Sequence, residues 1–386
     1  MDKINVAQPI VGEEEVEAVK EVILSGYYAP GPRVKEFENK FSDYIGTEYA
    51  ATTNGGTAAL HVALAAAGIG PGDEVIVPPM TFFATVAAVL HQNAIPVFAD
   101  IDQNSFCIDP EDVKEKISPK TKAIIPVHLF GNAAEMDEIN EIAENNDLIV
   151  IEDAAQAHGT EYKGEKVGSI GDIGCFSFYA TKHMTTGEGG IITTDDKEIA
   201  EKAKSIKGHG MTGRHEHSYL GYNYEMSDIN AAMGLVQLKK LDKLNERRIS
   251  NSEYLLDEIE KSISWLETPE IKPYVKHTYF WCPTVVKEDM IDMDTSEVID
   301  ILDNMGVETR NRYLEPIYHQ PVLEDLYPNG CPYDCQNVKP KYDELYLENA
   351  EDLVGRFIGL PNHPGLERED LDKVLEVLKK FEGEYV

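Results

Sequence analysis

The chain has 386 residues, 42% of them hydrophobic, which suits two or three domains with a sizeable core. It carries 35 Lys and Arg against 69 Asp and Glu, for a formal net charge of −34. So acidic a protein repels DNA, RNA and anionic membranes, so we expect no nucleic-acid or membrane partner.

The cysteines and the apolar runs exclude further classes of protein. The five cysteines are scattered and odd in number, which argues against a disulfide scaffold. Cys331 and Cys335 form a single CPYDC pair without the further ligands that a zinc site needs, so we expect no metal there. The first 20 residues lack the apolar run of a signal peptide, and no stretch reaches the roughly 20 apolar residues of a membrane span. These features predict a cytoplasmic protein.

The chain begins with helical patterns. Residues 1–25 contain an amphipathic helix with acidic residues in its first turn and Val16, Val19 and Val22 on its apolar stripe. The segment 25–34 is rich in Gly and Pro and predicts a loop, followed by a helix over 34–45.

From residue 48 short apolar runs alternate with helical stretches. The pattern predicts strands at 49–53, 74–77, 96–100, 123–127, 148–152, 175–179 and 191–194. It predicts helices at 57–67, 85–91, 110–116, 134–145 and 197–205. This alternation predicts an α/β fold with an open, mainly parallel sheet between helices, and ligands bind such sheets beyond the carboxyl ends of the strands.

The first strand is followed by a turn that suits an anion. Asn54, Gly55 and Gly56 connect it to a helix starting at Thr57, so free backbone amides and the helix dipole face one point, where a phosphate would fit. A plain turn with Thr57 as N-cap is the alternative.

Two further strands end in residues that suit a ligand. The second leads into Phe82 and Phe83, either of which could face a planar ligand or belong to the core. The fifth leads to Asp153, and a carboxylate at the mouth of a buried strand must be paired or hydrogen-bonded to remain charged.

Lys182 follows the apolar run 173–179 and precedes a glycine-rich turn, so it emerges where a buried strand ends. Burial would lower its pKa toward the range useful for a nucleophile or base, although a lysine that only snorkels from the strand end is an equal alternative. An anion cradle at Gly56 and Thr57, joined by Ser177, an aromatic ring at Phe82, the acid Asp153 and this amine together meet the requirements of pyridoxal 5'-phosphate (PLP).

Beyond the sheet, residues 220–226 form a loop before a long helical region, which Ser227 or Asp228 can cap. We expect a large domain over 1–250 and a smaller α/β domain over 251–386, with helices at 296–305 and 368–381 and strands at 279–286 and 307–310. The aromatic segment 310–335 suits a flap over the substrate or a surface excursion, and Tyr313 and His319 within it are candidate substrate contacts.

Many motifs in this order resemble one family. NGGTAALHVAL, GPGDEVIVPPMTFFAT, VIEDAAQAHG, FSFYATKHMTTGEGG, GYNYEMSDINAA and PIYHQP are similar to those of the DegT/StrS family of PLP enzymes, the nucleotide-sugar aminotransferases. The resemblance covers almost the whole chain. It implies PLP fold type I and a homodimer with the active site at the subunit interface.

The resemblance also implies residue roles. Lys182 looks like the lysine that binds the cofactor covalently, Asp153 like the partner of the pyridine nitrogen and Phe82 like the aromatic that stacks on the ring. Gln156 resembles the contact to the phenolic oxygen. The implied phosphate ligands are Gly56, Thr57 and Ser177, with Asn223 reaching over from the other subunit.

Two positions depart from the family pattern. Glu225 stands where Arg is common, which puts any charge contact from that position in doubt, and His183 stands where Asn is common. Sugar dehydratases of the family replace the lysine with His, so Lys182 favours amino transfer.

The expected reaction moves an amino group from L-glutamate to a nucleotide-linked 4-keto-6-deoxyhexose, at C4, for surface glycan synthesis. The alternatives are a PLP-dependent sugar dehydratase and a non-catalytic PLP-binding regulator.

Overall fold

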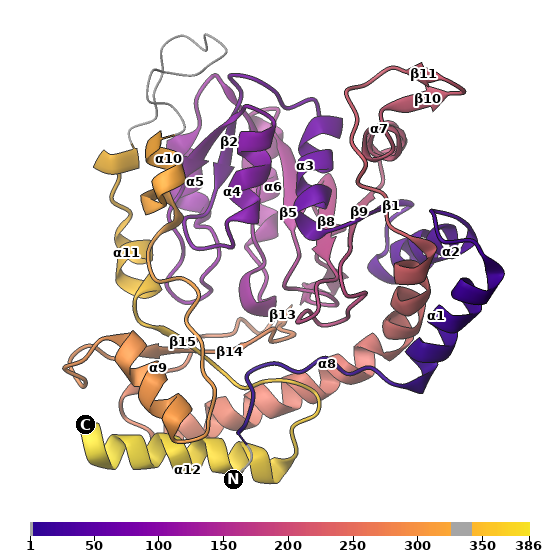
Figure 1. The fold of residues 1–386 in the computed structure, drawn as a ribbon. Coiled ribbons are helices and arrows are strands. Elements are labelled where there is room, and N and C mark those ends of the chain that lie inside the picture. Colours follow the sequence, from indigo (N-terminus) through magenta and orange to yellow (C-terminus); the bar gives the residue numbers. More distant parts are fainter. Residues whose placement is uncertain (1–2, 326–341) are drawn as a thin grey trace.

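A seven-stranded sheet forms the centre of the computed structural model, which describes residues 3–325 and 342–386 (Figure 1). Its order is β1-β9-β8-β5-β4-β2-β3, and all strands run in one direction except β9, which is antiparallel to both neighbours. The strands are β1 (Tyr49–Thr53), β2 (Glu74–Val77), β3 (Ile95–Phe98), β4 (Thr121–Ile124), β5 (Ile149–Asp153), β8 (Ile173–Ser177) and β9 (Gly190–Thr194). The predicted α/β fold with a mainly parallel sheet is confirmed.

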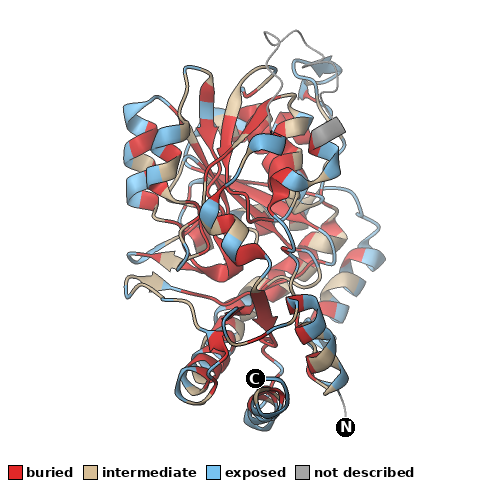
Figure 2. Ribbon diagram, turned by 90° about the vertical axis from the view of Figure 1, so that its left-hand side faces the viewer, coloured by how far each residue is buried: buried red, intermediate tan, exposed pale blue. Residues whose placement is uncertain are grey.

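Helices pack on this sheet in two groups. Helix α3 contacts α4 and α7, whereas α5 and α6 contact each other. The helices are α3 (Gly56–Ala66), α4 (Ala84–His91), α5 (Pro110–Lys116), α6 (Met136–Asn145) and α7 (Lys197–Lys207). Figure 2 shows the strands as buried and the outer helix faces as exposed, which is the pattern of a sheet covered by amphipathic helices.

A 35-residue helix, α8 (Asp228–Ser262), connects the sheet to the C-terminal part of the chain. Ser227 caps it by accepting a hydrogen bond from the Asn230 N–H at 3.2 Å. Its first half packs against α1 (Glu13–Ser25) and α2 (Pro32–Ile45).

A second hydrophobic core lies around the C-terminal half of α8. It is built on the antiparallel sheet β12-β14-β15, flanked by α9 and α12. These elements are β12 (Leu266–Glu267), β14 (Cys282–Val286), β15 (Phe357–Leu360), α9 (Thr295–Asn304) and α12 (Arg368–Tyr385). Ile4 joins this core from the other end of the chain and pairs with Val307. We propose a domain division near residue 250, within α8.

The remaining elements are short. They are β6 (Glu161–Tyr162), β7 (Glu165–Lys166), β10 (Met211–Gly213), β11 (Glu216–His217), β13 (Val275–Lys276), α10 (Pro321–Asp325), α11 (Glu348–Val354) and three single-turn helices at Leu129–Gly131, Ile317–His319 and Tyr342–Glu344. No helix of the described residues is long and apolar enough to span a membrane.

The strands of the central sheet lie within two or three residues of the predicted bounds, whereas the two strands predicted beyond residue 250 differ more. The strand expected at 279–286 begins only at Cys282, since Tyr279 has φ 49° and this left-handed conformation interrupts an extended chain. The segment 307–310 is not a regular strand, because it is held only by isolated bridges of Val307 to Ile4 and Arg310 to Gly359.

Candidate active site

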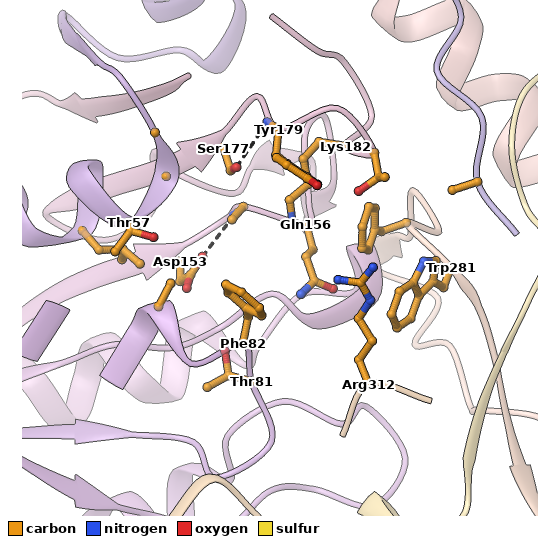
Figure 3. Close-up of a pocket in the computed structure, with 18 of the residues that line it drawn as sticks. Thr57, Thr81, Phe82, Asp153, Gln156, Ser177, Tyr179, Lys182, Trp281 and Arg312 are labelled. Atoms are coloured by element: carbon orange, nitrogen blue, oxygen red, sulfur yellow. Dashed lines mark hydrogen bonds between the residues drawn. The ribbon is translucent and has the colours of Figure 1, made fainter. Parts of the chain in front are cut away.

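A cavity of about 400 Å³ lies at the carboxyl ends of β1, β5 and β8 and extends to the segment 280–313 (Figure 3). This is where a ligand is expected in an open parallel sheet. Most of the residues singled out from the sequence line it, namely Gly56, Thr57, Phe82, Asp153, Gln156, Ser177, Lys182 and Tyr313.

Asp153 is the last residue of β5 and points into this cavity (Figure 3). Its Oδ2 accepts a hydrogen bond from the Thr85 hydroxyl at 2.8 Å, and its Oδ1 accepts one from the Ala155 N–H at 3.1 Å. Burial raises the pKa of this carboxyl, although the hydrogen bonds and the nearby Lys182 and His128 oppose the shift. A cationic partner in the cavity would therefore stabilise its charged form.

Lys182 follows β8, and its Nζ lies 4.5 Å from the centroid of the Phe280 ring. Burial lowers the pKa of this amine to about 8, while Asp153 raises it and the Arg312 cation lowers it further. At neutral pH a useful fraction of Lys182 is therefore a neutral amine, which is the nucleophilic and proton-accepting form.

The lowered pKa of Lys182 predicts how the rate of cofactor binding depends on pH. Only the neutral amine attacks an aldehyde, so the rate at which the cofactor-free protein binds PLP covalently should rise with pH to a plateau, with a midpoint at about 8. Stopped-flow absorbance across the neutral and alkaline range measures this rate. A midpoint near the value of about 10.4 for an exposed lysine would contradict the environment described for Lys182.

The N-terminus of α3 approaches Ser177 closely. The N-cap is Gly55, and no side chain caps the helix, so its first amides remain available to an anion. A Cβ on Gly56 would lie 2.7 Å from the Ser177 Cβ. Only glycine therefore allows the first turn of α3 to share one cradle with the Ser177 hydroxyl.

Phe82 and Gln156 lie on other walls of the cavity. The Phe82 side chain is 58% exposed although it lies in the cavity, so an apolar ring face is left for a planar ligand to cover. The Gln156 Oε1 accepts a hydrogen bond from the Phe130 N–H at 3.1 Å, and its Nε2 donates to the Tyr313 hydroxyl at 3.1 Å. Burial raises the pKa of Tyr313 to about 12, so this phenol remains protonated at neutral pH.

The chemistry of this donor set fits PLP. The cavity offers backbone amides and a hydroxyl for a phosphate, an aromatic face, a buried carboxylate for a ring nitrogen and an amine of lowered pKa for an aldehyde. No cluster of three or more potential metal ligands occurs in the described residues.

Two of the candidate site residues do not line the cavity. His319 is partly exposed, and its Nε2 lies 3.4 Å from the Glu351 Oε1 instead of lining the cavity. Asn223 is exposed and lies outside the cavity of the single chain, where it pairs with Gly208. The CPYDC pair, Cys331 and Cys335, lies outside the described residues, as does much of the aromatic segment 310–335.

Two groups of residues were not singled out from the sequence. One group lines the cavity from beyond residue 250 and consists of Phe280, Trp281, Arg310 and Arg312, of which the last two belong to the segment 310–335 that was predicted as a flap or a surface excursion. The other is Glu152, which is fully buried next to Asp153. The sequence did indicate this residue. Neighbouring residues of a strand face opposite sides of the sheet, so the two acids of LIVIED cannot share one site, and a buried second acid needs hydrogen-bond partners of its own.

Glu152 holds the turn before β8 in place. Its Oε1 accepts hydrogen bonds from the Ile170 and Gly171 N–H groups at 2.8 and 2.7 Å. Its Oε2 accepts from the Gly168 N–H at 2.7 Å and lies 2.9 Å from the His128 Nε2. The His128 Nδ1 accepts from the Ala134 N–H, so Nε2 carries the proton and donates to Glu152.

Glu152→Gln is expected to lower the free energy of unfolding by about 2–4 kcal/mol, because its amide NH₂ would oppose N–H donors in a buried site. Chemical denaturation measures the change, and Glu165→Gln on the exposed β7 is the matched control. Equal stability of the two variants would mean that the hydrogen bonds to Glu152 contribute little.

The fold and the donor set of the cavity define the chain as an α/β protein with a site that suits PLP, and comparison with known proteins identifies it as a PLP-dependent aminotransferase of sugars. The chain belongs to the DegT/DnrJ/EryC1/StrS aminotransferase family, whose model matches residues 9–379. It is 37% identical to the GDP-perosamine synthase of Caulobacter vibrioides over 98% of both chains. It is also 37% identical to the spore coat polysaccharide biosynthesis protein SpsC of Bacillus subtilis, over 96% of this chain and 95% of that protein.

A solved structure supports the identity of the cofactor. NtdA from Bacillus subtilis, with bound cofactor PMP, matches with a TM-score of 0.85 at 30% identity over 96% of this chain and 82% of that chain. The cofactor of the present protein is PLP.

Proposed function

We propose that the protein transfers the amino group of L-glutamate to the C4 keto group of a nucleotide-linked 4-keto-6-deoxyhexose. The observation that carries this proposal is the presence of Lys182 and Asp153 on one cavity, with an amine pKa of about 8. The similarity to a GDP-perosamine synthase supports a nucleotide-linked sugar, and the similarity to SpsC supports a role in surface glycan synthesis.

The residues of the cavity have different roles in the proposed reaction. Gly56, Thr57 and Ser177 would hold the phosphate of PLP, and Phe82, which also lines the cavity, would pack on its ring. Gln156, which the Phe130 amide orients, contacts the phenolic oxygen. Together these residues would hold the cofactor in one orientation.

Asp153 and Lys182 control the protons. Asp153 keeps a proton at the ring nitrogen, because a buried carboxylate is stabilised by a cationic partner. When bound, PLP supplies an electron sink for the carbon that loses its proton. Lys182, as a neutral amine, accepts that proton and then donates it to the carbon that becomes protonated next.

We also propose a cytoplasmic homodimer in which Asn223 contacts the cofactor phosphate of the partner subunit. The exposure of Asn223 outside its own cavity is consistent with such a role. The described cysteines, Cys107, Cys175 and Cys282, are free and buried, as is usual in a reducing compartment.

A substrate screen tests the reaction. UDP-, GDP- and dTDP-linked ketosugars are incubated with the PLP-loaded protein and L-glutamate, and 2-oxoglutarate is measured. Release that depends on one ketosugar supports the proposal. Conversion of the sugar without 2-oxoglutarate would point to a dehydratase, and cofactor binding with no conversion would point to a regulator.

A further inference from the structure

Arg312 lines the cavity as an exposed side chain, and like Lys182 its cationic group has no hydrogen-bond or ion-pair partner among the described residues. Its guanidinium carbon lies 5.9 Å from the centroid of the Trp281 ring, and Figure 3 shows the group directed toward Gln156 in the middle of the cavity. Two residues earlier, Arg310 also lines the cavity, but its Nη2 and Nε donate to the Glu308 Oε1 at 2.6 and 3.1 Å. Within residues 3–325 and 342–386, no hydrogen bond or ion pair engages the Arg312 guanidinium.

The electrostatics of the cavity favour an anionic ligand at Arg312. The Lys182 Nζ lies over the Phe280 ring and Arg312 lies over the Trp281 ring, and these two rings stack with centroids 5.4 Å apart, so the two cations face the same space. The charge of Arg312 accordingly lowers the pKa of the Lys182 amine. The acids that line the cavity, Asp153 and Glu188, form no ion pair with Arg312. In a chain of net charge −34 the overall field repels anionic substrates, so their binding needs a local cation of this kind.

The two substrates carry their anions at different distances from the reacting atoms. In an amino acid, the α-carboxylate is one bond from the carbon whose proton Lys182 removes. In a nucleotide-linked sugar, the diphosphate is attached at C1 and the pyranose ring separates it from the keto group at C4. A cation on the Lys182 side of the cavity therefore suits the carboxylate, whose planar geometry matches the guanidinium fork.

We propose that Arg312 binds the α-carboxylate of the amino donor and thereby determines donor binding. This inference rests on the proposed transfer from an amino acid. Arg312 is then a substrate-binding residue of the first half-reaction, whereas the nucleotide diphosphate is held elsewhere, at the open side of the cavity.

The test compares Arg312→Gln with wild type in the PLP-loaded protein. The first half-reaction is followed without any sugar, by the loss of the visible absorption of the lysine-bound cofactor as donor is added. The half-saturating concentration of L-glutamate should rise roughly 10- to 100-fold. L-Alanine has the same α-amino and α-carboxylate groups but no distal carboxylate, and it should show a rise of similar size. The KM of the ketosugar should change less than about 3-fold.

Two further variants serve as controls. Arg312→Lys keeps the positive charge but loses the planar guanidinium that can donate two parallel hydrogen bonds, so it should retain part of the donor affinity. Arg368→Gln removes one exposed positive charge on α12 and should leave both half-reactions at wild-type values. Cofactor content and unfolding temperature establish that each variant is folded.

Several outcomes would overturn the inference. An unchanged half-saturating concentration of donor would exclude Arg312 from donor binding. A rise for L-glutamate but not for L-alanine would assign Arg312 to the distal carboxylate. A rise only in the KM of the ketosugar would assign it to the diphosphate. If wild type reacted with no amino acid at all, the proposed function itself would fail, and this result is distinct from the other three.

Discussion

Lys182→Ala is expected to lower the rate of amino transfer at least about 10³-fold. The lysine is the amine of the cavity whose pKa, lowered to about 8 by burial, suits both attack on an aldehyde and proton transfer. In the function proposed above, its removal takes away the covalent link to PLP and the proton acceptor together. Turnover assays and the visible spectrum of the purified protein measure the two losses separately.

A matched control separates this effect from the loss of a positive charge. Lys380 lies on α12 with 63% of its side chain exposed, and its Nζ is 3.8 Å from the Glu384 Oε1. Lys380→Ala should retain the wild-type spectrum and rate. Undiminished turnover in Lys182→Ala would show that another residue carries the chemistry.

Asp153→Asn is expected to lower turnover about 10²-fold or more, because an amide cannot hold a proton at the ring nitrogen by charge. The substitution is nearly isosteric. The oxygen of the introduced amide could accept from the Ala155 N–H, and its NH₂ could donate to Thr85, whose hydroxyl already lies 2.9 Å from that of Thr81. The loss should therefore be catalytic and should not reflect unfolding.

The same substitution should stabilise the cofactor-free protein. Burial raises the pKa of Asp153, and an acid of raised pKa loses stabilising free energy as pH rises above its unfolded value of about 3.9. The amide that replaces it stays neutral and has no such loss. Calorimetry should therefore give cofactor-free Asp153→Asn a higher unfolding temperature than wild type at neutral pH, with a smaller difference near the unfolded pKa of about 3.9.

The control for this effect is Asp43→Asn, which removes an exposed negative charge from α2 and should change neither the rate nor the unfolding temperature by much. A cofactor-free Asp153→Asn protein that unfolds at a lower temperature than wild type would contradict the buried-charge argument.

The sequence predicted most of the large-domain side of the cavity, since that side is encoded locally. Each of its residues follows a strand whose apolar pattern is visible, as with Asp153 at the end of β5 and Gly56 after β1. In a parallel sheet the carboxyl ends of all strands meet at one edge, so local patterns suffice to gather these residues. The fold class could be predicted for the same reason.

On the other side of the cavity, only Tyr313 was predicted from the sequence. Trp281 and Arg312 reach the cavity because the segment around them packs on the large domain through aromatic contacts. The Phe130 ring stacks on Phe357 with centroids 4.3 Å apart, and on Trp281 at 5.7 Å. Phe130 and Phe357 are far apart in the sequence, and no short pattern encodes their contact. His319 shows the same limit, because its contact with Glu351 depends on where α11 lies.

The sequence by itself therefore determined the class of fold and the residues that suit PLP, because strand ends, glycine turns and a lysine that follows a strand are local features. Only the tertiary structure decided which charges in the described residues remain without partners. Arg310 and Arg312 are two residues apart in the same segment, yet Glu308 engages the first and leaves the second free. The free energy of a charge depends on the partners that the fold brings within a few ångströms, and the order of residues does not specify that distance.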